Sequence, residues 1–235
     1  MLALTPVEAE ALRLSLRVAF WSVAGSLPFA VLVALLLARI DFPGKSLLDA
    51  VVHLPLVLPP VVIGYVLLIF LGRHGPLGEM LENVFGIVVA FRWTGAAIAA
   101  AIMAFPLMVR AIRLSIEGID RGLEAAAGTL GAGHVWIFFT VTLPLAMPGV
   151  ITGVLLSFAR SLGEFGATIT FVSNIPGETQ TLPLAIYTFT QVPGGDAQAL
   201  RLSVIAVLLS IAALIVSEII ARRAIWRVRG HDIKY

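Results

Sequence analysis

The sequence predicts an all-α polytopic membrane protein with five membrane-spanning helices in one domain, residues 1–235. Hydrophobic residues make up 59% of the chain and charged residues only 13%, whereas soluble domains carry about 25% charged and about 45–50% apolar residues. The apolar residues form long runs, and a transmembrane helix needs about 20 of them. No long soluble segment separates these runs. The expected spans cover residues 18–39, 49–72, 93–112, 146–172 and 200–221.

The first span is predicted from the uncharged run Val18–Ala38, which Arg17 and Arg39 bound. A cleaved signal peptide needs a basic region before its apolar core, but Glu8 precedes the first arginines. We therefore expect this span to be retained. Burying several charges before position 18 would be costly, so no sixth span is expected there. Arg13 and Arg17 are instead expected on a helix along, or partly in, the interface.

The second span contains Pro55, Pro59 and Pro60. A proline inside a helix removes a hydrogen-bond donor and kinks the helix, and membrane proteins tolerate this where neighbouring groups satisfy the freed carbonyls. From the residues alone, a kink in the wall of a translocation pathway and a bend that only serves packing are equally compatible. If the kink lines the pathway, Pro59 and Pro60 are its candidate residues.

The fourth span is interrupted by Arg160 and Glu164, which are four residues apart and so lie on one helical face. Ionisable groups inside a span are costly and usually face a partner or a watery cavity. They form either an ion pair that locks helix packing or a gate in the pathway. Gly163 and Gly166 indicate close helix contact or a local break. Because a bare carboxylate repels anions, Glu164 is expected to act as a structural or gate partner.

The third span ends at Arg110 and Arg113, and the fifth runs to Arg222. The long loop between the fourth and fifth spans carries turn residues at 174–181 and 193–196. Such residues predict an ordered surface, which either docks a substrate-delivering protein or is a plain exposed loop.

Orientation follows from the distribution of Lys and Arg, which are enriched on the cytoplasmic side. With the C-terminus inside, ten fall in inside segments and five in outside segments. The inside set is Arg39, Lys45, Arg110, Arg113, Arg121, Arg222, Arg223, Arg227, Arg229 and Lys234; the outside set is Arg13, Arg17, Arg73, Arg92 and Arg201. Five spans then require the N-terminus outside and the C-terminus in the cytoplasm.

Several functions are excluded by residues that the chain lacks. No dense basic run interleaved with aromatics occurs, so no nucleic-acid role is expected. There is no cysteine, which excludes thiolate metal sites and cysteine nucleophiles. The four histidines lie in different segments, so no metal site is expected. No G-x-x-x-x-G-K-[ST] phosphate loop occurs, so the chain cannot hydrolyse ATP alone and no catalytic residue is expected.

The inside loop, 113–145, contains a short helix of small residues that is expected to begin at Leu123 after a turn at Gly118–Gly122. A helix that docks into the groove of another protein needs little side-chain bulk. The candidate contact residues with small side chains are Ala126, Ala127, Gly131, Ala132 and Gly133. The bulky run that follows, Val135–Phe139, is expected to anchor the helix on the membrane-facing side. The bland alternative is an alanine-rich cytosolic linker.

Residues 124–144, EAAAGTLGAGHVWIFFTVTLP, resemble the EAA loop of the membrane-spanning subunits of ABC importers. The pattern runs from Glu-Ala-Ala through a glycine to the Leu143-Pro144 end, and the resemblance adds Glu124 to the residues expected to couple to the ATPase. Two departures are present: Glu124 stands one place earlier than in the strictest motif, and Gly128 replaces a residue that is often basic. The run Ser161–Gly166 and the turn Asp41–Gly44 are similar to the molybdate and sulfate permease branch.

This resemblance implies the transmembrane domain of a type I ABC importer in the bacterial cytoplasmic membrane, with a cytoplasmic coupling loop and a pathway for molybdate. It further implies two copies of this chain, two copies of a separate ATPase that binds ATP and Mg²⁺, and a periplasmic or surface-tethered oxyanion-binding protein. The chain itself is expected to hold no cofactor. Lipid surrounds it.

Other functions stay open at this point. A tungstate or sulfate/thiosulfate permease is the rival within the class. A secondary transporter usually shows repeated halves with broken helices, and no convincing repeat occurs here. A membrane enzyme would need clustered polar residues on facing spans, where only Arg160 and Glu164 qualify.

Overall fold

The computed structural model describes residues 4–229, and these residues form helices and turns without a β-strand. In chain order the helices are α1 (Pro6–Arg39), α2 (Lys45–Val57), α3 (Pro60–Leu71), α4 (Pro76–Phe85), α5 (Trp93–Glu117), α6 (Arg121–Thr129), α7 (His134–Ile137), the π-helix η1 (Phe138–Thr142), α8 (Leu143–Leu162), α9 (Gly166–Val172), α10 (Leu182–Gln191) and α11 (Asp196–Arg229). Four helical segments are long and apolar enough to cross a membrane, and a fifth crossing is possible if the bent pair α2–α3 counts as one. The predicted all-α membrane class is confirmed.

Helix α1 begins about three turns before the first predicted span. Thr5 and Glu8 form a capping box, in which the Thr5 side chain accepts a hydrogen bond from the Glu8 N–H and Glu8 accepts one from the Thr5 N–H. The Glu8 side chain is fully buried, and Arg201 of α11 lies 2.8 Å from it. The ion pair with Arg201 offsets the free-energy cost of burying the Glu8 carboxylate. That cost was the argument against burying the chain before residue 18.

The second predicted span, 49–72, is two helices that differ in direction by 113°. The break falls at Leu58 and Pro59, between α2 and α3. Two successive prolines lack N–H donors, and the residue before a proline is disfavoured in the helical conformation. Pro55 lies inside α2 and does not end it. The expected kink is therefore a sharp turn between two separate helices.

The fourth predicted span, 146–172, is also divided. Helix α8 ends at Leu162, and the short helix α9 begins at Gly166. In the other direction, α8 continues from α7 through η1, so that residues 134–162 form one apolar helical segment. The π-helix lies where the loop 113–145 enters the apolar segment, and π-bulges are frequent at functional sites.

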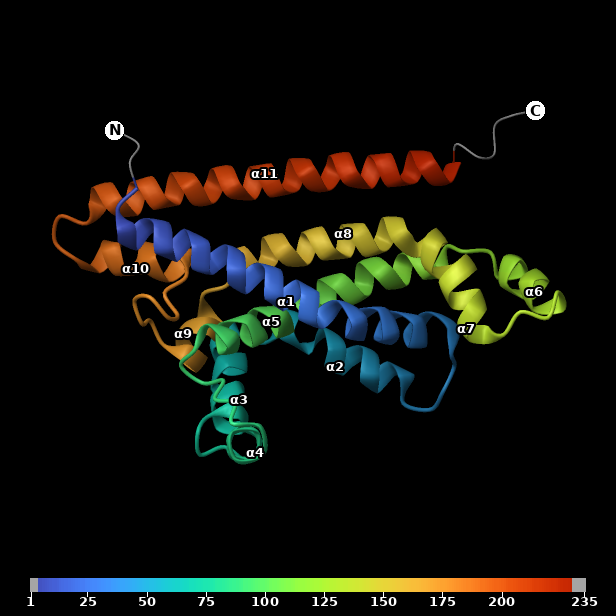
Figure 1. Cartoon of the computed structure of the whole chain (residues 1–235), viewed down its shortest axis with the longest axis horizontal. Coiled ribbons are helices and arrows are strands. Elements are labelled where there is room, and N and C mark those ends of the chain that lie inside the picture. Colours follow the sequence, from blue (N-terminus) through green and yellow to red (C-terminus); the bar gives the residue numbers. More distant parts are fainter. Residues whose placement is uncertain (1–3, 230–235) are drawn as a thin grey trace.

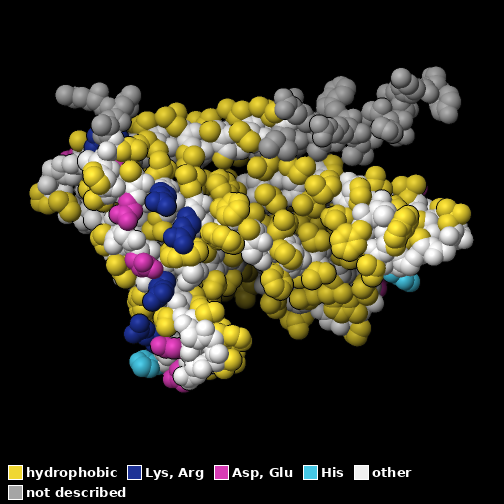
Figure 2. Space-filling view, viewed as in Figure 1, with side chains coloured by type: hydrophobic (Ala, Val, Ile, Leu, Met, Phe, Trp, Pro, Cys, Tyr) yellow, Lys and Arg dark blue, Asp and Glu magenta, His cyan; other side chains and the backbone are white. Residues whose placement is uncertain are grey.

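Helices α1, α5 and α8 pack together along the long axis of the molecule, with α11 beside them (Figure 1). Small side chains of α5, including Ala96, Ala99, Ala100 and Ala104, are buried in these contacts. Small residues allow transmembrane helices to approach closely. Apolar side chains cover most of the face seen in Figure 2, as expected for a surface in lipid.

The two ends of the molecule carry different segments (Figure 1). The start of α1, α10 and the start of α11 lie at one end, and α6, α7 and the end of α11 lie at the other. At the second end Lys45 lies 2.8 Å from Asp41 in the turn between α1 and α2, and its hydrogen bond and charge lower the pKa of that carboxyl. The predicted orientation relative to the cytoplasm stays a prediction. Lys234, which contributed to it, lies outside the described residues, as do the side chains of Arg222, Arg223, Arg227 and Arg229.

Candidate coupling helix and pathway residues

The coupling helix expected in the inside loop is α6, which begins at Arg121, two residues before the expected start. Asp120 caps it, because its carboxylate accepts a hydrogen bond of 2.8 Å from the Gly122 N–H. At the other end the Ala132 N–H donates to the Ala127 carbonyl and the Gly131 N–H donates to the Gly128 carbonyl. This is a Schellman C-cap, and Gly131 holds its left-handed position with φ +87°.

Glu124 does not face outward as a docking residue would. Its Oε1 lies 3.2 Å from Nη2 of Arg39, the last residue of α1. The same oxygen accepts a 2.7 Å hydrogen bond from Thr142 Oγ1 at the end of η1. The side chains of Arg39 and Glu124 are only 13% and 21% exposed, and Arg39 also donates to the Ile119 carbonyl. Glu124 therefore attaches α6 to both α1 and the α8 segment.

The remaining predicted coupling residues divide by exposure. Ala126, Gly131 and Gly133 are exposed, whereas Ala127 and Ala132 are half-buried. No neighbouring atom lies near the position of a Gly131 side chain, so Gly131 is required by its backbone conformation and not by a tight internal contact.

Leu130 was missed by the sequence analysis. Its side chain is 89% exposed directly before the cap glycine. Large exposed apolar residues continue beyond it with Val135, Trp136 and Phe139, while Ile137 and Phe138 are half-buried. The signal that could have identified Leu130 is a single large apolar residue among small ones at the helix end. An exposed leucine at such a site suits a groove on a partner protein.

The two helix breaks meet in space, where α3 packs against α9. A Cβ on Gly166 would lie 2.8 Å from Pro60 Cβ, and a Cβ on Gly64 would lie 2.5 Å from the Ala167 carbonyl oxygen. Only glycine permits this approach. Pro60 and Gly166, predicted as pathway residues from different spans, are thus brought together, while Pro59 forms the adjoining corner.

Glu164 lies in the break between α8 and α9, and its side chain is 2% exposed. Its Oε2 lies 2.7 Å from Nη1 of Arg160, and its Oε1 accepts a 2.9 Å hydrogen bond from the Ala167 N–H at the start of α9. The expected Arg160–Glu164 contact is present. Arg160 keeps 31% of its side chain exposed. Gly163 is exposed at the break and makes no close contact.

The loop between α9 and α10 is ordered by its own hydrogen bonds. The Thr179 hydroxyl accepts from the Ile175 N–H and donates to the Ser173 carbonyl. Asn174 donates to Thr188 at 2.7 Å, and the Leu182 N–H donates to Ser15 of α1 at 2.6 Å. Among the side chains that the structure describes, no three His, Asp or Glu are grouped so as to hold a metal ion.

Comparison with known proteins gives consistent matches along nearly the whole chain. Residues 26–226 match the family described as binding-protein-dependent transport system inner membrane component. The chain is 60% identical over 219 residues to the molybdenum transport system permease protein ModB of Escherichia coli K12, covering 93% of this chain and 96% of that protein. It is 58% identical to ModB of Haemophilus influenzae, with coverage of 92% and 95%. The sulfate transport system permease protein CysW of Synechococcus elongatus is 41% identical, covering 75% of this chain and 62% of that protein.

Solved structures share the fold at much lower sequence identity. A bacterial alginate ABC transporter in complex with a pentasaccharide-bound periplasmic protein matches with a TM-score of 0.74 at 16% identity, covering 94% of this chain and 81% of that chain. An amino acid ABC transporter with histidines matches with a TM-score of 0.65 at 20% identity, covering 93% and 94%. The fold is that of the transmembrane domain of a type I ABC importer.

Proposed function

The chain belongs to the family of binding-protein-dependent transport system inner membrane components, and from this premise we propose that it is the inner-membrane permease subunit of an ATP-driven molybdate importer. The observation that supports molybdate as the substrate is the 60% identity to a molybdenum permease over 93% of the chain. The observation that supports coupling to an ATPase is helix α6. This helix is capped, is bonded to α1 and η1 through Glu124, and ends in the exposed Leu130.

The working transporter contains two copies of this chain, two copies of a separate ATPase and an oxyanion-binding protein outside. The ATPase is required because this chain has no phosphate-binding loop. Large apolar side chains remain exposed on α2, α3 and α4, including Val57, Tyr65, Phe70 and Phe85. Such surface is available to lipid and to a second copy.

Energy from ATP enters through α6. When the ATPase subunits close, they draw the two α6 helices toward each other, with Leu130 in the groove of the ATPase. The Glu124 carboxylate passes this displacement to α1 through Arg39 and to α8 through Thr142. Helix α8 leads to the break at Gly163, where the α3–α9 contact supplies a packed element that can change arrangement.

Arg160 is the cation of this break that remains partly exposed. With Glu164 held by the α9 N-terminus and by Arg160 itself, the carboxylate is kept away from the passing anion. Arg160 therefore offers the passing anion the N–H donors that Glu164 does not use, while Glu164 fixes the position of Arg160.

Sulfate is the second candidate cargo, because a sulfate permease is 41% identical over 75% of this chain. A measurement of uptake distinguishes molybdate from sulfate as the cargo. Cells lacking their own molybdate importer should accumulate labelled molybdate when they express this chain with its ATPase and binding protein. Excess tungstate and sulfate serve as competitors. Sulfate accumulation without molybdate accumulation would assign the rival cargo, and failure of the ATPase to copurify would contradict the importer assignment.

The proposed orientation has a separate test. A reporter inserted near Gly177 should be active only in its periplasmic form, and one placed after Lys234 only in its cytoplasmic form, because the Lys and Arg residues favour this arrangement. A cytosolic reporter near Gly177 would invert the topology and remove α6 from the reach of an ATPase.

A further inference from the structure

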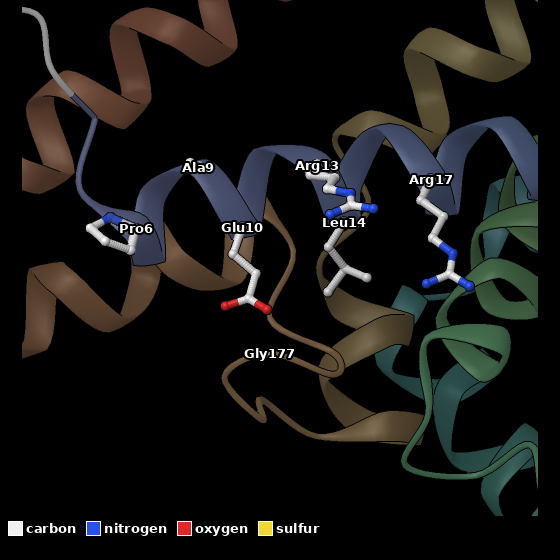
Figure 3. Close-up of a pocket in the computed structure, with 7 residues that line it drawn as sticks. All are labelled: Pro6, Ala9, Glu10, Arg13, Leu14, Arg17 and Gly177. Atoms are coloured by element: carbon white, nitrogen blue, oxygen red, sulfur yellow. The ribbon is translucent and has the colours of Figure 1, made fainter.

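A pocket of about 460 Å³ lies beside α1, near the loop that precedes α10, and none of the sites above uses it. Glu10, Arg13 and Arg17 of α1 line it, with Gly177 of the loop opposite (Figure 3). Glu10 and Arg17 extend from the same side of α1, with Arg13 between them along the helix. The pocket thus presents one negative charge followed by two positive charges along the helix axis.

Neither arginine is neutralised by a neighbour. Arg13 and Arg17 are exposed, and no carboxylate of the described residues lies within ion-pair distance of either guanidinium. The Arg17 guanidinium carbon lies 3.7 Å from the centroid of the Trp93 ring. Stacking uses the face of the guanidinium and leaves the N–H donors on its edge free. Arg17 is therefore held in place with unused donors.

The level of these charges follows from the length of the apolar run. Twenty-one uncharged residues, Val18–Ala38, separate Arg17 from Arg39, and at about 1.5 Å per residue they span about 32 Å. The hydrocarbon core of a bilayer is about 30 Å thick. Arg17 therefore lies at the edge of the core, with Arg13 about 6 Å and Glu10 about 10 Å further out. Tryptophan favours this interfacial level, which agrees with the position of Trp93.

Apolar surface begins immediately below the arginines. Phe20 and Trp21, one turn further along α1, are both more than half exposed. In Figure 2 basic side chains border a broad hydrophobic surface on this face. A ligand here therefore meets a carboxylate, then two guanidiniums, and then apolar side chains.

We propose that this pocket binds the headgroup of an ethanolamine phospholipid. The phosphodiester accepts hydrogen bonds from Arg13 and Arg17, the ammonium lies toward Glu10, and the acyl chains pass along Phe20 and Trp21. In such a lipid the phosphate lies next to the glycerol and the ammonium further from the acyl chains, which is the order of the complementary charges on α1. This site goes beyond the transport function, and the proposed topology assigns it to the outer leaflet.

Glu10 distinguishes this ligand from other anions. A free oxyanion or a phosphatidylglycerol headgroup offers no positive charge to Glu10, and the carboxylate repels both. A free oxyanion also leaves the adjoining apolar surface unused. The lipid's own ammonium is what makes the acidic residue favourable.

The test measures lipid binding to the purified complex of this chain with its ATPase by native mass spectrometry. Phosphatidylethanolamine and phosphatidylglycerol are titrated separately. The intact chain should prefer phosphatidylethanolamine. Arg13→Gln and Arg17→Gln should each weaken binding about fivefold, equivalent to about 1 kcal/mol for one basic residue at a lipid surface. Glu10→Gln should weaken only ethanolamine lipid and so remove the preference.

Arg73→Gln is the matched control, because Arg73 is an exposed arginine in the turn between α3 and α4 and does not line this pocket. It should leave binding unchanged. Arg17→Lys keeps the charge and guards against a folding defect; it should bind lipid better than Arg17→Gln. Equal preference in the Glu10→Gln variant and the intact chain would overturn the proposal. Displacement of the lipid by inorganic phosphate or molybdate would assign the site to a free anion. If the Arg13→Gln and Arg17→Gln variants bound lipid as the intact chain does but no longer bound the oxyanion-binding protein, the site would be assigned to that protein.

Discussion

Replacing Glu124 by alanine removes two bonds at once, those to Arg39 at 3.2 Å and to Thr142 at 2.7 Å. Breaking a buried ion pair costs about 3–5 kcal/mol, whereas an exposed pair contributes about 0.2–1 kcal/mol. Because the two charged side chains are 13% and 21% exposed, we expect the attachment of α6 to weaken by about 2 kcal/mol. At about 1.4 kcal/mol for each factor of ten, this is roughly 30-fold.

The assay is the amount of molybdate moved for each ATP hydrolysed, measured in proteoliposomes that contain the complete transporter. Glu124→Ala should retain ATP hydrolysis and lower this ratio by up to about 30-fold. Thr142→Val, which removes one of the two bonds, should lower it less. Glu117→Ala is the matched control, because that carboxylate pairs with Arg113 on α5 and makes no hydrogen bond or ion pair with the described residues of α6.

A double-mutant cycle decides whether Arg39 and Glu124 act through each other. If they do, Arg39→Ala combined with Glu124→Ala should cost less than the sum of the single changes. Additive losses, or an unchanged ratio of transport to hydrolysis in Glu124→Ala, would refute the attachment of α6 through this pair.

Three further predictions concern single positions. Gly131→Asp should abolish uptake and weaken copurification of the ATPase while the chain stays in the membrane, and Gly131→Asn should be milder, because both residues tolerate the left-handed conformation that Gly131 holds but only aspartate brings an unpaired charge into the contact with the ATPase; equal effects of the two would show that the added charge is not the cause. Glu164→Gln should reduce uptake more than the double change Arg160→Gln with Glu164→Gln, since the single change leaves Arg160 without its partner at 2.7 Å; uptake and membrane abundance measure this, and additive losses would contradict it. Gly64→Ala should destabilise the α3–α9 contact by about 1–3 kcal/mol, because its Cβ would lie 2.5 Å from a backbone oxygen; an unchanged melting temperature of the purified complex would exclude this.

Composition and apolar runs predicted the membrane class and the centres of the helices, because burial in lipid depends on local sequence. Pro59 and Pro60 indicated a bend, but its 113° angle depends on α3 packing against α9, which lies about a hundred residues later in the chain. The early start of α1 was missed for a similar reason. The burial of Glu8 is compensated by Arg201, and no local pattern connects two residues that far apart.

In the candidate sites, too, features set by local sequence could be predicted, whereas features set by contacts between distant segments could not. The small residues of 124–133 identified a coupling helix, yet the direction in which Glu124 points depends on Arg39 and Thr142 from two other segments. From the sequence, Arg39 was identified only as the residue that ends the first span, not as a partner of Glu124. The Arg160–Glu164 pair could be predicted because four residues of separation fix two side chains on one helical face. Leu130 was overlooked because exposure is a property of the folded loop.

The proposed importer uses ATP to move molybdate across the membrane. The most direct measurement is the flux of labelled molybdate into proteoliposomes that contain this chain, its ATPase and its loaded binding protein. Accumulation of molybdate should require ATP hydrolysis, persist when ion gradients are dissipated and be lost when the ATPase is omitted. Accumulation that follows an ion gradient without ATP would contradict the proposed function and indicate a secondary transporter.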